Sequence, residues 1–258
     1  MNILEIGELV KTYDTGHRAL DGLTLTVPEG SVFGFIGLNG AGKTTTIRIL
    51  AGLTPRDSGT VQVMGRPVGG AGSEYKRAIG FVLDEPLYFD WMAPADYLRF
   101  VGVMYGVPEP DVRTRVEELL EFFELAERRN DQIRTFSTGM KKKISLAAAV
   151  IHQPKLIILD EPFEGIDALA ANAIKEGLSM MASRGTTIMI TSHVLDTVER
   201  FCTDVGIIHR GKLLLQSRTS EIRSRVRDTL EQTPYASLEE LFVDLVSDRV
   251  RRRHLSWL

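Results

Sequence analysis

The sequence has almost no cysteine and no long hydrophobic run. Its 258 residues contain one cysteine, Cys202, which excludes an internal disulfide and suits a reducing compartment. An isolated cysteine is usually a small buried hydrophobe, so we assign it no catalytic role. No stretch reaches the ~18 to 20 apolar residues that a transmembrane helix needs. The first residues, MNILEIGELVKTYD, are acidic where a signal peptide is basic and then apolar. We therefore expect a cytoplasmic chain.

The sequence also lacks a strong excess of charge of either sign. Its 31 Lys and Arg against 34 Asp and Glu leave a net charge of -3, which gives no general attraction to nucleic acid. One basic cluster, DRVRRRH, lies near the end, and two interpretations stay open for it: a solvated tail, or contact with acidic lipid headgroups. We see no solenoid-length repeat and no low-complexity tract. These features predict a globular protein that does not bind nucleic acid.

What the sequence does contain is a series of apolar runs that read as buried strands, several of them separated by helical patterns. Strands that alternate with helices predict an α/β fold with a mostly parallel, doubly wound sheet. The runs are bounded by Gly, Pro, Asp and Ser, and are LTLTV, SVFGFIG, AIGFVL, KLIILD, TTIMITS and DVGIIHRGKLLL.

The middle of the chain changes to a helical pattern. In DVRTRVEELLEFFELAERR, apolar residues recur at steps of three and four with charges between them. We predict a helical subdomain at about residues 84–151, inserted into a core formed by residues 1–83 and 152–215. Residues 216–258 form a C-terminal extension that contains a short amphipathic helix, SLEELFVDLV. The apolar positions in the middle pattern are Val112, Val116, Leu119, Leu120 and Phe123.

The segment GFIGLNGAGKTTT matches the P-loop pattern that binds nucleotide phosphates. Its glycines let successive backbone N–H groups point at phosphate oxygens, and the helix that follows adds its positive N-terminal end. Lys43 supplies a charge to the β- and γ-phosphates, and the Thr44 hydroxyl can ligate Mg²⁺. The strand before and the helix after are the context that the motif requires. The predicted ATP-binding residues here are Asn39, Gly40, Ala41, Gly42, Lys43, Thr44 and Thr45.

The tetrapeptide LDEP occurs twice, at Asp84 and Glu85 and again at Asp160 and Glu161, and its surroundings distinguish the two copies. The second copy lies within IRTFSTGMKKKISLAAAVIHQPKLIILDEP and is followed by EGIDALA and TTIMITSH. This whole run resembles the nucleotide-binding subunits of ABC transporters. The resemblance extends from Leu4 to Leu215. It covers Tyr13 as the aromatic that stacks on adenine, the P-loop, the Walker B strand with its carboxylates, the D-loop (Gly165, Ile166, Asp167), the switch residue His193, and a signature segment in place of LSGGQ (Phe136, Ser137, Thr138, Gly139, Met140).

The resemblance implies a P-loop NTPase with a RecA-like, mostly parallel sheet core, an antiparallel β edge, and the helical insertion. It assigns Asp160 to Mg²⁺ and Glu161 to the attacking water, with His193 near the γ-phosphate. Transfer of the γ-phosphoryl group needs such separate groups, because a carboxylate held at the metal cannot also approach the water in line. Ser137 and Gly139 would meet the ATP of a second subunit, so the implied enzyme is a homodimer.

In this family the first LDEP falls at the Q-loop, where a Gln usually stands at the position of Asp84. Asp84 is therefore a candidate catalytic and Mg²⁺-binding residue, although an Asp is shorter than a Gln and carries a charge. A second interpretation remains open, in which Asp84 and Glu85 cap the helical insertion. The run Lys141 to Lys143 reads as a solvated helix face, and a supporting electrostatic role beside the phosphate site stays open for it.

The resemblance also implies partners. A chain without a membrane span needs separate permease subunits to move a solute, which places it on the cytoplasmic face of the membrane. The segment EPLYFDWMAP is dense in aromatics, which either dock the permease or pack in the core. The signature, the Q-loop and the C-terminal helix resemble bacterial ABC-2-type efflux ATPases. Two alternatives stay open: a soluble ABC ATPase without a transport role, and a regulator that binds ATP without efficient turnover.

Overall fold

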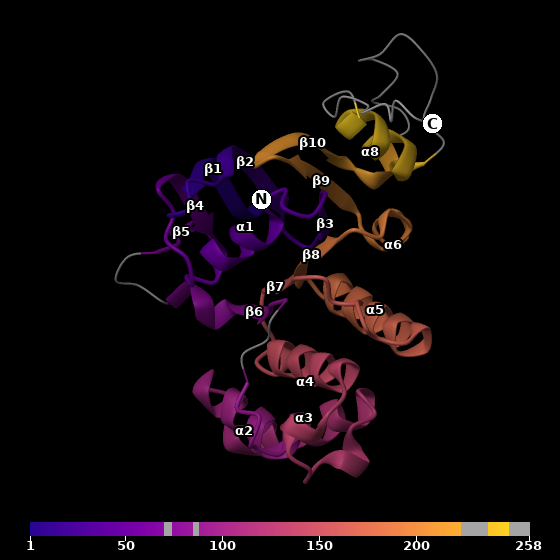
Figure 1. The fold of residues 1–258 in the computed structure, drawn as a ribbon. Coiled ribbons are helices and arrows are strands. Elements are labelled where there is room, and N and C mark those ends of the chain that lie inside the picture. Colours follow the sequence, from indigo (N-terminus) through magenta and orange to yellow (C-terminus); the bar gives the residue numbers. More distant parts are fainter. Residues whose placement is uncertain (70–73, 85–87, 223–236, 248–258) are drawn as a thin grey trace.

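The computed structural model of the chain describes residues 1–69, 74–84, 88–222 and 237–247 (Figure 1). The predictions made for Glu85 and for the basic cluster DRVRRRH lie outside these ranges. None of the helices in the described part of the chain has both the length and the apolar character that crossing a bilayer requires.

An antiparallel sheet forms one side of the molecule. Its two longest strands, β1 and β2, largely alternate buried with more exposed positions, as expected of a sheet with one face in the core. They are ordered β2-β1-β4-β5, with β1 at Asn2–Thr12, β2 at Arg18–Pro28, β4 at Ser58–Val63 and β5 at Arg66–Pro67. This is the antiparallel β edge that the sequence predicts.

A second sheet carries the parallel core. Five of its strands are parallel, and only β10 pairs antiparallel, with β9, after a two-residue turn at Arg210 and Gly211 where both φ angles are positive. The run DVGIIHRGKLLL is therefore a hairpin. The order is β10-β9-β3-β8-β7-β6, with β3 at Val32–Ile36, β6 at Ile79–Val82, β7 at Leu156–Leu159, β8 at Thr187–Ser192, β9 at Asp204–His209 and β10 at Lys212–Arg218.

The central strands of this sheet are buried throughout because both of their faces are covered. Phe33 and Phe35 of β3 face a core shared with the antiparallel sheet and with helix α1 (Lys43–Leu50). Val32 and Ile36 face the opposite core, which includes side chains of α4 (Thr138–Val150), α5 (Ala168–Ser183) and α6 (Leu195–Phe201). The period of two in each strand thus assigns neighbouring residues to different cores.

The described chain between β6 and β7 forms helices and turns, which lie together at one end of the molecule (Figure 1). They include α2 at Pro94–Met104, α3 at Glu109–Phe122, and α4. The predicted apolar stripe is buried at Val112, Val116, Leu120 and Phe123 and partly buried at Leu119. The inserted helical subdomain of the predicted fold is present, while its limits at 84 and 151 stay a prediction.

The predicted amphipathic helix near the C-terminus is α8, at Leu238–Ser247. It joins the core beside α6, and the backbone N–H of Leu238 donates to the Glu199 side chain at 3.1 Å. β10 continues to Arg218, so this strand crosses the limit at 215 that the sequence predicts for the ATPase domain.

Candidate active site

A cavity of about 810 Å³ opens where the P-loop, the ends of β7 and β8 and the turn after β1 come together. The carboxyl ends of parallel strands are where α/β proteins place their ligands. Of the predicted site residues, the cavity gathers Tyr13, Asn39, Gly40, Ala41, Gly42, Lys43, Thr44, Thr45, Asp84, Asp160, Glu161 and His193.

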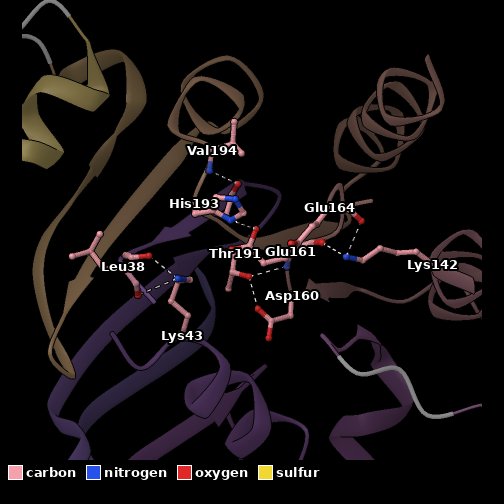
Figure 2. Close-up of polar contacts among 11 residues, drawn as sticks. Leu38, Lys43, Lys142, Asp160, Glu161, Glu164, Thr191, His193 and Val194 are labelled. Carbon is pink, nitrogen blue, oxygen red and sulfur yellow. Dashed lines mark hydrogen bonds and ion pairs between the residues drawn. The ribbon is translucent and has the colours of Figure 1, made fainter. Parts of the chain in front are cut away.

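The P-loop backbone forms the floor of this cavity. Gly42 has φ 114°, and a Cβ there would lie 2.7 Å from the Ala19 carbonyl oxygen, so a side chain is excluded on both grounds. Helix α1 begins at the next residue, Lys43, with its N-terminus at the cavity. The Lys43 ammonium group donates to the carbonyl oxygens of Gly37 at 2.6 Å and Leu38 at 3.4 Å (Figure 2).

Burial lowers the pKa of Lys43, while the nearby carboxylates Glu161 and Asp160 oppose this shift. In the described part of the chain, the hydrogen-bond acceptors of this ammonium group are the two carbonyl oxygens, so it gains from an anionic ligand, since charge-assisted hydrogen bonds are the stronger kind. The arrangement suits a phosphate at this position.

The two carboxylate oxygens of Asp160 differ: one accepts a hydrogen bond, and the other has no partner among the described residues. The residue is 1% exposed, and its Oδ1 accepts a hydrogen bond from the Thr191 hydroxyl at 2.5 Å. Its Oδ2 is buried and has no hydrogen-bond partner among the described residues. Buried polar atoms are normally satisfied, so Oδ2 fits a missing partner such as Mg²⁺ or a metal-bound water. The described residues contain no group of three His, Cys, Asp or Glu side chains that could hold a metal ion.

Glu161, the residue after Asp160, is held through both its main chain and its side chain. Its backbone N–H donates to the Thr191 hydroxyl at 2.9 Å, and its Oε2 lies 3.1 Å from His193 Nδ1 (Figure 2). Its φ of 46° is in the left-handed region, which is uncommon for a residue with a side chain. His193 follows directly after β8, as the sequence predicts. The strand ends thus bring the two candidate catalytic side chains into contact.

Thr191 is a site residue that sequence reasoning missed, because threonine is ordinary in a buried strand. Its single hydroxyl connects Asp160 to the backbone of Glu161. We expect Thr191→Val, which keeps the shape but removes the hydroxyl, to lower kcat for ATP hydrolysis by roughly 10- to 100-fold, since small misplacements of reacting groups have effects of that size. Phosphate release measures this. Thr191→Ser is the control and should stay near wild type; a Val variant with normal kcat would contradict the role.

The remaining predicted residues divide into two groups. The Tyr13 hydroxyl lies 3.2 Å from the Thr45 hydroxyl, and Asp84 is exposed at the cavity edge. Asp84 does not cap α2, because that helix begins only at Pro94 with Ala93 as its N-cap residue. Ser137 and Gly139 do not line the cavity.

The signature residues instead form an exposed helix start of their own. The Ser137 hydroxyl caps α4 by accepting from the Met140 N–H at 3.3 Å. A Cβ on Gly139 would lie 2.9 Å from the Gly165 carbonyl oxygen, so glycine permits close contact with the D-loop. This helix start has the features of an anion site, but it lies outside its own chain's cavity.

The positions of Lys142 and Phe242 were not predicted from the sequence. The prediction that Lys141 to Lys143 form a solvated face is wrong for Lys142, which is buried and donates to the main chain near Glu161. Every residue from Ile144 to Ala149 is buried, so the burial pattern along α4 does not single out Lys142. Phe242 of α8, which belongs to the predicted C-terminal extension, also lines the cavity.

The fold and the cavity together define a P-loop NTPase with an inserted helical subdomain and a paired acidic strand end. The sequence model of the family described as ABC transporter matches residues 20–164, more than half of the chain. The protein therefore belongs to the ABC transporter family: it is an ATP-binding subunit of an ABC transporter, and an ATPase.

Similar proteins agree with this assignment. The linearmycin resistance ATP-binding protein LnrL of Bacillus subtilis (strain 168) is 37% identical over 86% of this chain and 72% of its own. The daunorubicin/doxorubicin resistance ATP-binding protein DrrA of Streptomyces peucetius is 34% identical over 86% of this chain and 67% of its own. A solved ATP-binding subunit of an ABC transporter has a TM-score of 0.87 and 32% identity, covering 95% of this chain and 99% of its own.

A further solved structure, a dimeric ATP-binding cassette bound to ADP and Pi in a post-hydrolysis state, has a TM-score of 0.76 at 20% identity. It covers 84% of this chain and 98% of its own, and its likeness concerns the fold alone.

Proposed function

We propose that this chain is the ATPase of an exporter whose permease is a separate chain, and that it acts at the cytoplasmic face of the membrane through that permease. Support comes from relatives named for resistance to linearmycin and to daunorubicin and doxorubicin. In this arrangement the permease selects the transported compound.

The proposed working unit is a head-to-tail homodimer. Ser137 and Gly139 lie outside the cavity of their own chain, yet Ser137 begins a helix whose N-terminus suits an anion. In a head-to-tail pair, each cavity would be closed by the partner's signature segment. Two ATP molecules would then be held between the two chains, and a monomer would be an incomplete enzyme.

Within each site we assign the roles as follows. Lys43 and the P-loop N–H groups hold the β- and γ-phosphates, and Asp160, Thr44 and Asp84 would hold Mg²⁺, which neutralises charge on the phosphates when bound. Glu161 accepts the proton of the attacking water, and His193 orients its carboxylate or reaches the γ-phosphate. Asp160 and Glu161 are adjacent in sequence, but their carboxylates have different partners. Asp160 contacts Thr191, and Glu161 contacts His193.

The observation that carries the transport proposal is an exposed aromatic cluster, Phe89, Trp91 and Phe100, on the helical subdomain. The Phe89 ring centroid lies 4.9 Å from that of Trp91 and 5.4 Å from that of Phe100, and Trp91 is 60% exposed. Tyr88 is partly buried against the core, so core packing accounts for Tyr88. It does not account for Phe89 and Trp91, which are exposed. Exposed aromatic patches of this kind favour a partner surface.

The cluster is also connected to the signature segment. The backbone N–H groups of Ile133 and Arg134 donate to the carbonyl oxygens of Met92 at 3.0 Å and Asp90 at 2.8 Å. Asp90 and Met92 are the sequence neighbours of Trp91. Ile133 and Arg134 precede Ser137 by a few positions. A permease that shifts the cluster would therefore shift the signature, which is the mechanical coupling that transport needs.

Co-purification in mild detergent, with identification of the bound membrane protein, tests the proposal. We expect Trp91→Ala to weaken the complex by roughly 30-fold, the effect of losing about 2 kcal/mol at an interface hot spot, and to reduce the stimulation of ATP turnover by the permease. Phe122→Ala, which removes another exposed aromatic of the helical subdomain, is the matched control and should leave both unchanged.

Each alternative function predicts a different outcome. Absence of any membrane partner, together with normal turnover, would favour a soluble ABC ATPase. Turnover that is undetectable with and without the partner would favour a regulator. A Trp91→Ala variant that assembles and is stimulated normally would reject the docking surface alone.

A further inference from the structure

Lys142 is the one member of the lysine run that points into the protein. It is 8% exposed, and its ammonium group donates to the carbonyl oxygen of Glu161 and to that of Glu164, the latter at 3.3 Å (Figure 2). Its neighbours differ: Lys141 lies over the Tyr88 ring at 5.9 Å, and Lys143 pairs with the Glu124 carboxylate at 2.8 Å. Only Lys142 reaches the turn after the Walker B strand.

Burying an ammonium group is costly unless hydrogen bonds and opposite charges compensate. Burial lowers the pKa of Lys142, and the carboxylates of Glu164, Asp84, Glu161 and Asp160 oppose that shift. The ammonium group is buried against the two main-chain carbonyl oxygens that its donors hold, those of Glu161 and Glu164.

What they hold is the backbone around Glu161. A left-handed φ is unfavourable for a residue with a Cβ, so this conformation persists only where neighbours stabilise it. Thr191 holds the N–H of residue 161, and Lys142 holds its C=O. The two contacts lie on either side of the Cα that carries the side chain, and so they determine where the carboxylate points.

We propose that Lys142 is a positioning residue for ATP hydrolysis, which orients the carboxylate of Glu161 by donating to the main-chain carbonyl of that same residue. The inference rests on the role proposed for Glu161. Helix α4 would then have two roles. Its start at Ser137 meets the ATP of the partner chain, and Lys142 holds the turn that carries Glu161 in its own chain. Lys142 itself need not touch ATP or water.

The full-length chain carrying Lys142→Met tests this, since methionine keeps the length and removes the donors. We expect kcat to fall by roughly 10- to 100-fold, while the Kd for ATP, measured with a fluorescent ATP analogue, changes by less than about 3-fold. Lys142→Arg keeps a buried cation with donors and should restore most of kcat. Lys143→Met removes the same charge one residue further along α4 and should leave kcat unchanged.

A double variant separates positioning from a general structural effect. If Lys142 acts only through Glu161, adding Lys142→Met to Glu161→Gln should lower single-turnover hydrolysis no further. An equal fold-loss in both backgrounds would overturn the proposal, as would a Met variant with normal kcat. If thermal unfolding shows that the Lys142→Met chain is not folded, the same comparison is made with Lys142→Gln, which keeps one hydrogen-bonding group.

The outcomes also distinguish this inference from the role of Glu161 itself. Normal hydrolysis by Glu161→Gln would reject the proposed base whatever Lys142 does. Slow hydrolysis by Glu161→Gln combined with a fully active Lys142→Met would reject only the positioning role.

Discussion

Glu161→Gln should slow ATP hydrolysis by about two to four orders of magnitude, the usual contribution of a general base, while ATP-bound dimers persist. Glutamine has nearly the same shape but cannot accept the proton of the attacking water. The main-chain hydrogen bonds of residue 161 to Thr191 and Lys142 do not involve the carboxylate, so the turn should keep its conformation. Phosphate release measures the loss, and size-exclusion chromatography with ATP measures the dimer.

The control for this prediction is the other copy of LDEP. Glu85→Gln makes the same chemical change in the first copy and should have a much smaller effect, because the resemblance places only the second copy at the Walker B strand. Equal losses in the two variants, or normal turnover by Glu161→Gln, would contradict the assignment.

Lys43→Met should abolish most activity by a different route. The charge-assisted hydrogen bonds of this ammonium group to phosphate are worth about 1.5 to 3 kcal/mol, so ATP affinity should fall by roughly 10- to 100-fold. Hydrolysis should fall by a further factor of about 10² to 10³, typical for removing one group that stabilises transition-state charge. Equilibrium ATP binding and kcat measure the two effects separately.

Two comparisons make this prediction specific. Lys155→Met, at an exposed position outside the cavity, should leave binding and turnover unchanged. Glu161→Gln should accumulate ATP-bound dimers, whereas Lys43→Met should not. A Lys43→Met chain that binds ATP with normal affinity would show that the cavity cation is not a phosphate ligand.

The strands, the P-loop and the order of the motifs could be predicted because each depends on neighbouring residues. A run such as SVFGFIG reads as a doubly covered strand, and β3 lies within it. GAGKT reads as a phosphate loop because its glycines and lysine are contiguous. The stripe from Val112 to Phe123 follows from the period of a helix. These signals required no knowledge of which segments meet in space.

Contacts between distant segments could not be predicted in this way. Thr191 and Asp160 are 31 positions apart, and Lys142 and Glu161 are 19 apart. Nothing local distinguishes Thr191 from other strand threonines, or Lys142 from the two lysines beside it. Which carbonyl oxygen Lys142 meets depends on how α4 packs against the turn after β7.

Composition and spacing along the chain encode local backbone conformation, and they were enough to predict a phosphate loop, a paired acidic strand end and a helical insertion. Which polar atoms share one cavity, and which remain outside it, depends on contacts between distant segments. Parallel strand order brings β7 and β8 side by side, and the packing of α4 then places a buried ammonium group against the turn that carries Glu161.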